Sequence, residues 1–368
     1  MRVGIPKEIK NNEYRVGLTP ASVAELTAAG HEVIVESNAG GGIDFRDQDY
    51  SDVGARIVAT PAEVFAGADL IVKVKEPQPQ EIALIEPRHT LFTYLHLAAD
   101  KAQAEGLMKS GATCIAYETV TSRSGALPLL KPMSEVAGRM AVQVGAHYLE
   151  KEQGGRGVLL GGVPGVAPAR VAILGGGVSG VNAAQLAVGM RADVTIYDIN
   201  NDRLAELDMF FSSQIKTAYA SKAAIAAAVK NAHLVIGAVL VPGAAAPKLV
   251  TREMLKTMKR GSVLVDIAID QGGCFETSHP TTHQHPVFEV EGVIHYCVGN
   301  MPGAVARTST FALNNATLPF ARRLADLGAE AAMKADPYLA TGLNVYRGQI
   351  THHAVADALD LPFHAWAA

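Results

Sequence analysis

Residues 170–198 read RVAILGGGVSGVNAAQLAVGMRADVTIYD, and this stretch decides the fold. The apolar run over 170–174 has the pattern of a buried strand, and residues 178–190 have the pattern of a helix. A second strand follows over 193–197. Strand, helix and strand in immediate succession predict a βαβ unit, in which the two strands are parallel and lie in one sheet.

The turn between this strand and helix carries glycines at the spacing Gly-x-Gly-x-x-Gly, at Gly175, Gly177 and Gly180. In a dinucleotide-binding turn the first glycine allows a tight bend, the second lets a pyrophosphate approach, and the third brings helix and strand together. Val178 then opens the helix whose N-terminus would face the phosphates. The alternative is a purely structural glycine turn, but the strand and helix around it favour a nucleotide site.

Asp198 stands at the end of the second strand, about twenty residues after the glycines, where a carboxylate binds the hydroxyls of an adenosine ribose. A carboxylate there also repels a 2′-phosphate, so we expect NAD rather than NADP. Arg203 lies close by and could instead accommodate that phosphate. We expect Asp198 to dominate.

The composition narrows the class of protein. A chain of 368 residues predicts two domains, and therefore a cleft. The net charge is -4 without a basic stripe, so we expect no nucleic acid partner. The three cysteines have no metal-ligand spacing, and no stretch of about 18 apolar residues occurs. We expect free thiols, no membrane span and, from the charged opening MRVGIPKE, a cytoplasmic protein.

Strand and helix patterns alternate on both sides of one long helical segment, 134–151. A first series occupies the first 130 residues, and a second begins at residue 170. The last helix, 309–327, and the polar tail after it show no strand partners nearby, and we expect them to pack on the first domain. The predicted fold is α/β, with two doubly wound Rossmann-like domains separated by a cleft. The predicted division is a catalytic domain of residues 1–130 plus 307–368 and an NAD-binding domain of residues 131–306.

Polar residues at predicted strand ends are candidates for chemistry, because parallel sheets bind ligands at that edge. Lys75 and His96 each end a predicted strand, and Arg15 lies in the loop after the first strand. Asp270 and Asn300 follow strands of the second domain. Each has a plainer alternative: a hydrogen-bonded structural histidine, a solvated edge for Lys73 and Lys75, an ion pair of Arg15 with Glu8 or Glu13, and an ordinary loop carboxylate at Asp270.

Three histidines, His279, His283 and His285, have a spacing that resembles a metal site. They lie in a predicted loop without a carboxylate partner nearby, which favours a solvated loop. We assign no metal.

Several long motifs resemble those of the alanine dehydrogenase and pyridine nucleotide transhydrogenase family. They are VGIPKEIKNNEYRVGLTP (3–20), VKVKEP (72–77), FTYLHLA (92–98), PMSEVAGRMA (132–141), VDIAIDQGGCFE (265–276) and CVGNMPGAVARTST (297–310). The resemblance covers nearly the whole chain. It implies an alanine dehydrogenase that uses NAD to interconvert L-alanine with pyruvate and ammonium.

The resemblance also implies residue roles. Arg15 and Lys75 would bind the substrate, and His96 and Asp270 would be the acid/base residues. Positions expected to contact the cofactor, besides the three glycines, are Ser134, Val178, Asp198, Arg203, Ser221, Val239, Leu240, Ile267, Asn300 and Met301. Two departures are visible: Ala220 stands where the family pattern has a serine, with Ser221 beside it, and His279 stands where it has an arginine.

Three other functions stay open at this point. The chain could be the NAD(H)-binding module of a proton-translocating transhydrogenase, a dehydrogenase for a larger amino acid such as saccharopine, or a non-enzymatic NAD sensor. The Arg15, Lys75, His96 and Asp270 set favours amino acid chemistry over the first and the last. The resemblance further implies a homohexamer, with the helix around 137–149 as a subunit contact.

Overall fold

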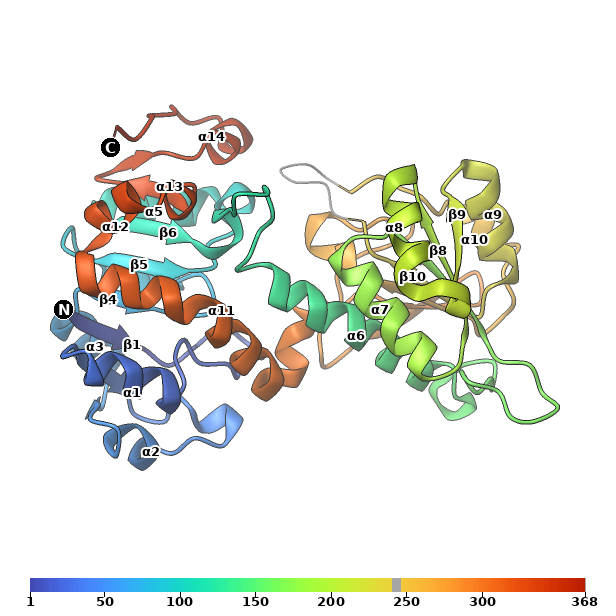
Figure 1. The fold of residues 1–368 in the computed structure, drawn as a ribbon, viewed down its shortest axis with the longest axis horizontal. Coiled ribbons are helices and arrows are strands. Elements are labelled where there is room, and N and C mark those ends of the chain that lie inside the picture. The colour runs from blue at the N-terminus through green and yellow to red at the C-terminus, as the bar shows by residue number, and fades with distance from the viewer. Residues whose placement is uncertain (240–245, 368) are drawn as a thin grey trace. The chain divides into compact units, whose positions relative to one another are not determined.

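The computed structural model describes residues 1–239 and 246–367 of the chain (Figure 1). They form two compact units. Unit 1 comprises Met1–Met133 and Val305–Ala368, and unit 2 comprises Ser134–Ala304. Each unit has its own sheet, and the long helix α6 (Lys131–Tyr148) contains the point at which the chain passes from one unit to the other.

Unit 1 is built on an eight-stranded sheet of order β15-β14-β6-β5-β4-β1-β2-β3. The first six strands in the chain are parallel, and the last two join the edge in antiparallel orientation. The bounds are β1 (Arg2–Ile5), β2 (Glu32–Glu36), β3 (Arg56–Val58), β4 (Leu70–Val72), β5 (Thr90–Thr93), β6 (Thr113–Ala116), β14 (Leu343–Tyr346) and β15 (Gln349–Ile350).

Several helices of unit 1 begin at residues whose side chains accept their first backbone N–H groups. Thr19 caps α1, Thr60 and Glu63 form a capping box at α3, and Asp100 caps α5. The bounds are α1 (Pro20–Ala28), α2 (Asp47–Ser51), α3 (Pro61–Gly67), α4 (Pro79–Ile82), α5 (Lys101–Ser110), α11 (Ala306–Leu327), α12 (Ala329–Ala335), α13 (Pro337–Ala340) and α14 (His353–Leu359).

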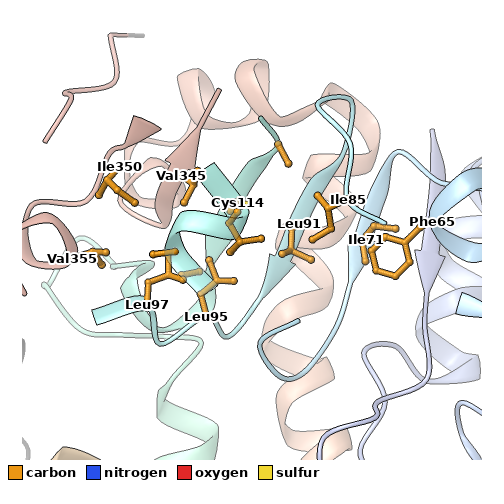
Figure 2. Close-up of a cluster of buried hydrophobic side chains, with 14 of the residues drawn as sticks. Phe65, Ile71, Ile85, Leu91, Leu95, Leu97, Cys114, Val345, Ile350 and Val355 are labelled. Atoms are coloured by element: carbon orange, nitrogen blue, oxygen red, sulfur yellow. The ribbon is translucent and has the colours of Figure 1, made fainter. Parts of the chain in front are cut away.

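The core of unit 1 joins the sheet to the C-terminal segment. One buried cluster contains Ile71 and Leu91 of the central strands, Leu95 and Leu97 of the loop after β5, and Val355 of α14 (Figure 2). The burial of these aliphatic side chains is the main force that holds the tail on this unit.

Unit 2 is built on a seven-stranded sheet of order β12-β13-β11-β10-β7-β8-β9, parallel except for β12. The strand bounds are β7 (Arg170–Leu174), β8 (Asp193–Asp198), β9 (Lys216–Tyr219), β10 (Leu234–Gly237), β11 (Val263–Asp266), β12 (Val287–Val290) and β13 (Val293–Tyr296). The helices after α6 are α7 (Val178–Gly189), α8 (Asn201–Phe211), α9 (Lys222–Asn231) and α10 (Arg252–Leu255).

Both sheets contain the doubly wound order in which six parallel strands run 3-2-1-4-5-6. In unit 1 the order reverses between β1 and β4, and in unit 2 between β7 and β10. The prediction of two doubly wound Rossmann-like α/β domains is therefore confirmed. In such sheets ligands bind beyond the carboxyl ends of the strands next to the reversal.

The structure corrects several details of the sequence analysis. Lys75 and His96, which were each predicted to end a strand, lie in loops three residues beyond β4 and β5, because these strands end at Val72 and Thr93. The tail does have strand partners, because β14 pairs with β6 and β15 pairs with β14. Strands β9 and β12 and helix α9 were also missed. These strands are short and only partly buried, so the apolar pattern that reveals a strand is weak in them.

Candidate functional site

In unit 1, Arg15 lies in the segment between β1 and α1 and is 2% exposed. Its Nε donates to Oε1 of Glu13 at 2.7 Å, its Nη2 donates to Oε2 of the same carboxylate at 2.6 Å, and its Nη1 lies 3.1 Å from Sδ of Met133. Burial by itself lowers the pKa of Arg15, but the hydrogen bond and charge of Glu13 outweigh it and raise the pKa above the ordinary value. The ion pair with Glu13 that the sequence suggested as an alternative role for Arg15 is therefore formed. Its two hydrogen bonds fix the guanidinium in one orientation.

Lys75 lies in the loop after β4, and its side chain is 12% exposed. Its backbone is held on both sides: its N–H donates to Oε1 of Glu8 at 3.3 Å, and its carbonyl accepts from Oγ1 of Thr93 at 2.9 Å. The ammonium group lies 4.0 Å from a carboxylate oxygen of Glu76. The ends of β1, β4 and β5 are therefore tied together around Lys75.

Lys73 differs from Lys75, because it is fully buried. Its Nζ lies 3.1 Å from Oε2 of Glu8 and 2.7 Å from Oε1 of Glu81. Burial pulls the pKa of Lys73 down, but the two carboxylates outweigh it and hold the pKa above the ordinary value. The suggestion that a solvated edge explains both lysines is wrong for Lys73.

His96 lies in the loop after β5, and its side chain is exposed. Its backbone is left-handed, with φ 50° and ψ 35°, and the short turn Leu97–Ala99 follows it. The imidazole stacks on the ring of Tyr94, with centroids 5.8 Å apart and planes 9° apart. Burial raises the pKa of Tyr94, and the charge of Arg15 opposes part of that shift.

The three unit 1 candidates, Arg15, Lys75 and His96, therefore all follow neighbouring strands of the sheet. Sequence reasoning did not select Glu118, which accepts the backbone N–H of His96, and it named Glu8 and Glu13 only as alternative ion-pair partners of Arg15. Glu118 comes two residues after β6, so the strand-end criterion that selected Lys75 and His96 could have found it.

In unit 2, the glycine turn has the geometry expected from its spacing. Gly175 has φ +105°, which a side chain disfavours, and a Cβ at Gly180 would lie 1.9 Å from the carbonyl oxygen of Gly175. A Cβ at Gly177, by contrast, would meet no atom within 4 Å. Gly177 precedes the first turn of α7, which begins at Val178 and has no side-chain cap. This open, uncapped helix N-terminus fits a pyrophosphate.

Asp198 ends β8 and is connected to the same turn. Its Oδ2 accepts the N–H of Gly176 at 2.7 Å, and its Oδ1 accepts the N–H of Asn200 at 2.9 Å. Arg203 donates from Nε to the carbonyl of Gly176 at 2.8 Å and from Nη1 to Oε2 of Glu206 at 2.6 Å. Asp198 thus faces the glycine turn, while Arg203 is engaged with a carbonyl and a carboxylate.

Other predicted cofactor residues follow the neighbouring strands of unit 2. Val239 comes after β10, and its Cγ2 would lie 3.2 Å from a Cβ at Gly175. Ile267 and Asp270 lie in the short turn Ile267–Gln271 after β11. A Cβ at Gly299 would lie 3.1 Å from Oδ1 of Asp270, which places Asp270 beside the turn that contains Asn300.

Asn300 has left-handed backbone geometry, with φ 58°, and Met301 beside it is buried. Asp266, which the sequence reasoning did not single out, is fully buried and accepts the N–H groups of Ala268 and Cys274. Burial raises its pKa. Asp266 therefore organises the turn that carries Ile267 and Asp270.

The remaining residues singled out from the sequence lie away from the glycine turn in the chain. Ser134 lies near the start of α6, and Ser221 caps α9 by accepting the N–H of Ala224 at 3.2 Å, a structural role beside Ala220. Leu240 lies outside the described residues. His279 stacks on Phe288 with ring centroids 3.6 Å apart.

Neither a cluster of metal-binding side chains nor a membrane-spanning helix occurs in residues 1–239 and 246–367. Within residues 1–239 and 246–367, no three His, Cys, Asp or Glu side chains are grouped so as to hold a metal ion. Across the same ranges, none of the helices has both the length and the apolar character needed to cross a bilayer.

Comparison with known protein families finds two matches. Residues 4–137 match the alanine dehydrogenase/PNT N-terminal domain, and residues 141–353 match the alanine dehydrogenase/PNT C-terminal domain. Together they span nearly the whole chain.

Individual relatives support the same family. The chain is 59% identical to an alanine dehydrogenase of Halomonas elongata, covering 99% of this chain and 98% of the relative. It is 56% identical to an alanine dehydrogenase of Mycobacterium tuberculosis, with the same coverage of both chains. A solved L-alanine dehydrogenase superposes with a TM-score of 0.95 at 53% identity, over 98% of this chain and 99% of that one. A transhydrogenase from Sinorhizobium meliloti is more distant, with a TM-score of 0.82 and 27% identity over 96% of this chain and 100% of that one.

Proposed function

Because the chain belongs to the alanine dehydrogenase/PNT family, we propose that it converts L-alanine and NAD to pyruvate, ammonium and NADH, and catalyses the reverse reductive amination. It is an alanine dehydrogenase, an oxidoreductase that uses a nicotinamide dinucleotide. The observation that carries this conclusion is the identity of 53–59% to alanine dehydrogenases along almost the entire chain.

The choice of NAD over NADP is our proposal, supported by the surroundings of Asp198. Its carboxylate follows β8 beside the glycine turn, where it would accept hydrogen bonds from ribose hydroxyls and repel a 2′-phosphate. Arg203, the residue that could bind such a phosphate, already donates hydrogen bonds to Gly176 and Glu206. When bound, the cofactor supplies a hydride acceptor for the Cα–H of alanine.

We propose that the residues of unit 1 bind and orient the substrate. Arg15, held by Glu13, would bind the carboxylate and thereby orient Cα for hydride loss. Oxidation of the Cα–N bond gives an imine, which water attacks to form a carbinolamine. Lys75 would stabilise negative charge on the oxygen that becomes the keto group of pyruvate.

His96 and Asp270 are proposed as the groups that move protons. One would take a proton from the attacking water, and one would return a proton to the nitrogen so that ammonia leaves. The exposure of the His96 imidazole and the position of Asp270 beside the Asn300 turn are consistent with these roles. The cofactor contacts proposed for unit 2 are those predicted above, from Ser134 to Met301.

A transhydrogenase-like NAD(H)-binding module is the second candidate, supported by the more distant structural match. That match has 27% identity, about half that of the alanine dehydrogenases. We also propose a homohexameric assembly and a cytoplasmic location. Sedimentation of the purified protein and fractionation of cells would test them.

The direct test is to mix the protein with NADH, ammonium and pyruvate and to follow the absorbance of the reduced nicotinamide. We expect oxidation of NADH with pyruvate, little with 2-oxoglutarate and little with NADPH. Tight binding of NADH without turnover would instead support the transhydrogenase-like module. The variant His96→Ala should bind NADH normally, but its turnover should fall by about 100-fold or more.

A further inference from the structure

We infer that Glu118 is a positioning residue for the reaction, because its carboxylate fixes the backbone conformation that presents the His96 imidazole. This inference rests on the proposed role of His96 in proton transfer. Glu118 lies in the segment after β6, the strand that pairs with β5 in parallel register. The loops after these two neighbouring strands therefore meet at the same edge of the sheet.

The contact itself is specific. Oε1 of Glu118 accepts the N–H of His96 at 2.6 Å, and both carboxylate oxygens lie 3.2 Å from the N of Leu95. One half-buried carboxylate thus accepts two consecutive backbone N–H groups at the start of the turn. Hydrogen bonds to an ionised acceptor are stronger than those between neutral groups.

His96 needs such support because its backbone is left-handed. In this conformation Cβ crowds the backbone, at a cost of about 1–2 kcal/mol for a residue other than glycine. Such a conformation persists only where surrounding contacts hold it, and it is often found at functional sites.

The neighbours of His96 show what the conformation achieves. Leu95 and Leu97, on either side of it, are both buried in the cluster that includes Val355 of α14 (Figure 2). Here the turn buries both leucines against the sheet and α14 while the imidazole between them is exposed.

The other backbone groups of the turn have different partners. The carbonyl of Leu95 accepts from Nε2 of Gln103 at 2.9 Å, and the carbonyl of His96 accepts the N–H of Ala99 at 3.1 Å. Glu118 is therefore the acceptor for the N–H groups of Leu95 and His96, while Gln103 and Ala99 donate to the carbonyls of the same two residues. Loss of the carboxylate would leave the N–H groups of Leu95 and His96 without this acceptor, and the turn could then relax from the left-handed conformation.

Relaxation of the turn would move the imidazole relative to Tyr94, on whose ring it stacks. Displacement of a reacting group by about 1 Å can lower a rate by about 100-fold. Substrate binding would suffer less, because Arg15 and Lys75 have their own carboxylate partners, Glu13 and Glu8. The signature of a positioning role is thus a loss in kcat with a nearly unchanged KM for pyruvate.

The test compares Glu118→Gln with Glu63→Gln in the full-length protein. Glu63 is a matched control, because one of its oxygens also accepts two consecutive N–H groups, those of Ala59 and Thr60, at the start of α3. Glutamine has the shape of glutamate, but it carries no charge and places a donor group on one side. Hydrogen exchange of the peptide containing residues 94–97, NADH affinity, kcat and KM are measured for both variants and for His96→Ala.

We expect Glu118→Gln to accelerate exchange at residues 95 and 96, to lower kcat by about 10- to 100-fold and to leave NADH affinity and KM within about threefold. Glu63→Gln should accelerate exchange only near residues 59 and 60 and leave kcat unchanged. If Glu118→Gln exchanges faster but turns over like Glu63→Gln, or if exchange does not change, the inference is wrong. If His96→Ala itself retains full turnover, the proposed role of His96 fails instead, and the two failures are distinguished.

Discussion

At the scale of single residues, the charged side chains inside unit 1 are held in pairs and networks. Lys73 is fully buried, and both of its carboxylate partners, Glu8 and Glu81, are buried as well. Glu8 also accepts the backbone N–H groups of Val74 and Lys75. The network therefore connects the interior of the sheet to the loop that presents Lys75.

Lys73→Met should strongly destabilise the protein, because it leaves two buried carboxylates without their cation. Removing one partner of a buried ion pair costs about 3–5 kcal/mol in the free energy of unfolding. Urea unfolding monitored by circular dichroism measures this cost. The control is Lys256→Met, since Lys256 forms an exposed pair with Glu253 and its loss should leave the unfolding midpoint nearly unchanged.

A second prediction at this scale concerns acid stability. Burial lowers the pKa of His295 to about 4, with smaller contributions in the same direction from His279 and Arg252, while the carbonyl of Val293 opposes the shift. Since the unfolded chain binds this proton near pH 6.5, the stabilisation is present above about pH 6.5 and is lost as the pH falls toward 4.

His295→Asn should therefore flatten the loss of unfolding free energy between pH 7 and pH 5, by roughly 1–3 kcal/mol. His285→Asn is the matched control, because His285 is exposed in a loop of the same unit and its replacement should leave the slope as it is. An unchanged slope in His295→Asn would contradict the assignment of this pH dependence to His295.

At the scale of elements, the glycines of the turn from β7 to α7 differ in role. Some are required because a Cβ would clash, and others leave space in which a ligand could bind. Gly180 has no room for a Cβ, because the carbonyl of Gly175 would be 1.9 Å away. Gly177 and Gly189, at opposite ends of α7, both have open space at that position. Only Gly177 stands at the helix N-terminus, where a phosphate would approach.

Gly177→Ala should fold like the unchanged protein but bind NADH about tenfold or more weakly, since the added methyl group would occupy the space proposed for the pyrophosphate. Gly189→Ala should bind NADH normally and, as an alanine in place of a helical glycine, unfold at the same or a slightly higher temperature. Calorimetric titration and thermal unfolding measure both. Equal NADH affinity in the two variants would remove Gly177 from the cofactor site.

At the scale of the whole molecule, each unit has its own sheet and its own buried cluster. Unit 2 is continuous in the chain, whereas unit 1 is assembled from both ends of it. The returning segment adds β14 and β15 to the sheet of unit 1 and places α14 on the loop that contains His96.

A chain of residues 131–304 should therefore fold alone and bind NADH, because it contains the whole β7–β13 sheet and the glycine turn. It should have no alanine dehydrogenase activity, since Arg15, Lys75 and His96 belong to unit 1. Fluorescence titration with NADH and the absorbance assay test the two halves of this prediction. A folded fragment that fails to bind NADH would contradict the assignment of the cofactor to unit 2.

The βαβ pattern around Gly175 and Asp198 could be predicted from sequence because it depends on local rules: apolar periodicity, glycine spacing and a carboxylate at a strand end. Both doubly wound sheets followed from the same alternation. Arg15, Lys75 and His96 were selected as candidates because polar residues follow apolar strands, although Lys75 and His96 proved to lie three residues beyond the strand ends.

The tertiary structure alone decided which distant groups hold Lys75 and His96. Three contacts join segments that are separate in the chain. They are the pairing of β14 with β6, the ion pair of Lys73 with Glu8, and the hydrogen bonds from the His96 turn to Glu118. Such contacts leave no periodic pattern, because each depends on which strands become neighbours in the sheet. The sequence by itself thus determined the two folds and the candidate residues for chemistry. The contacts that hold Lys75 and His96 in place came from long-range packing, which local patterns do not encode.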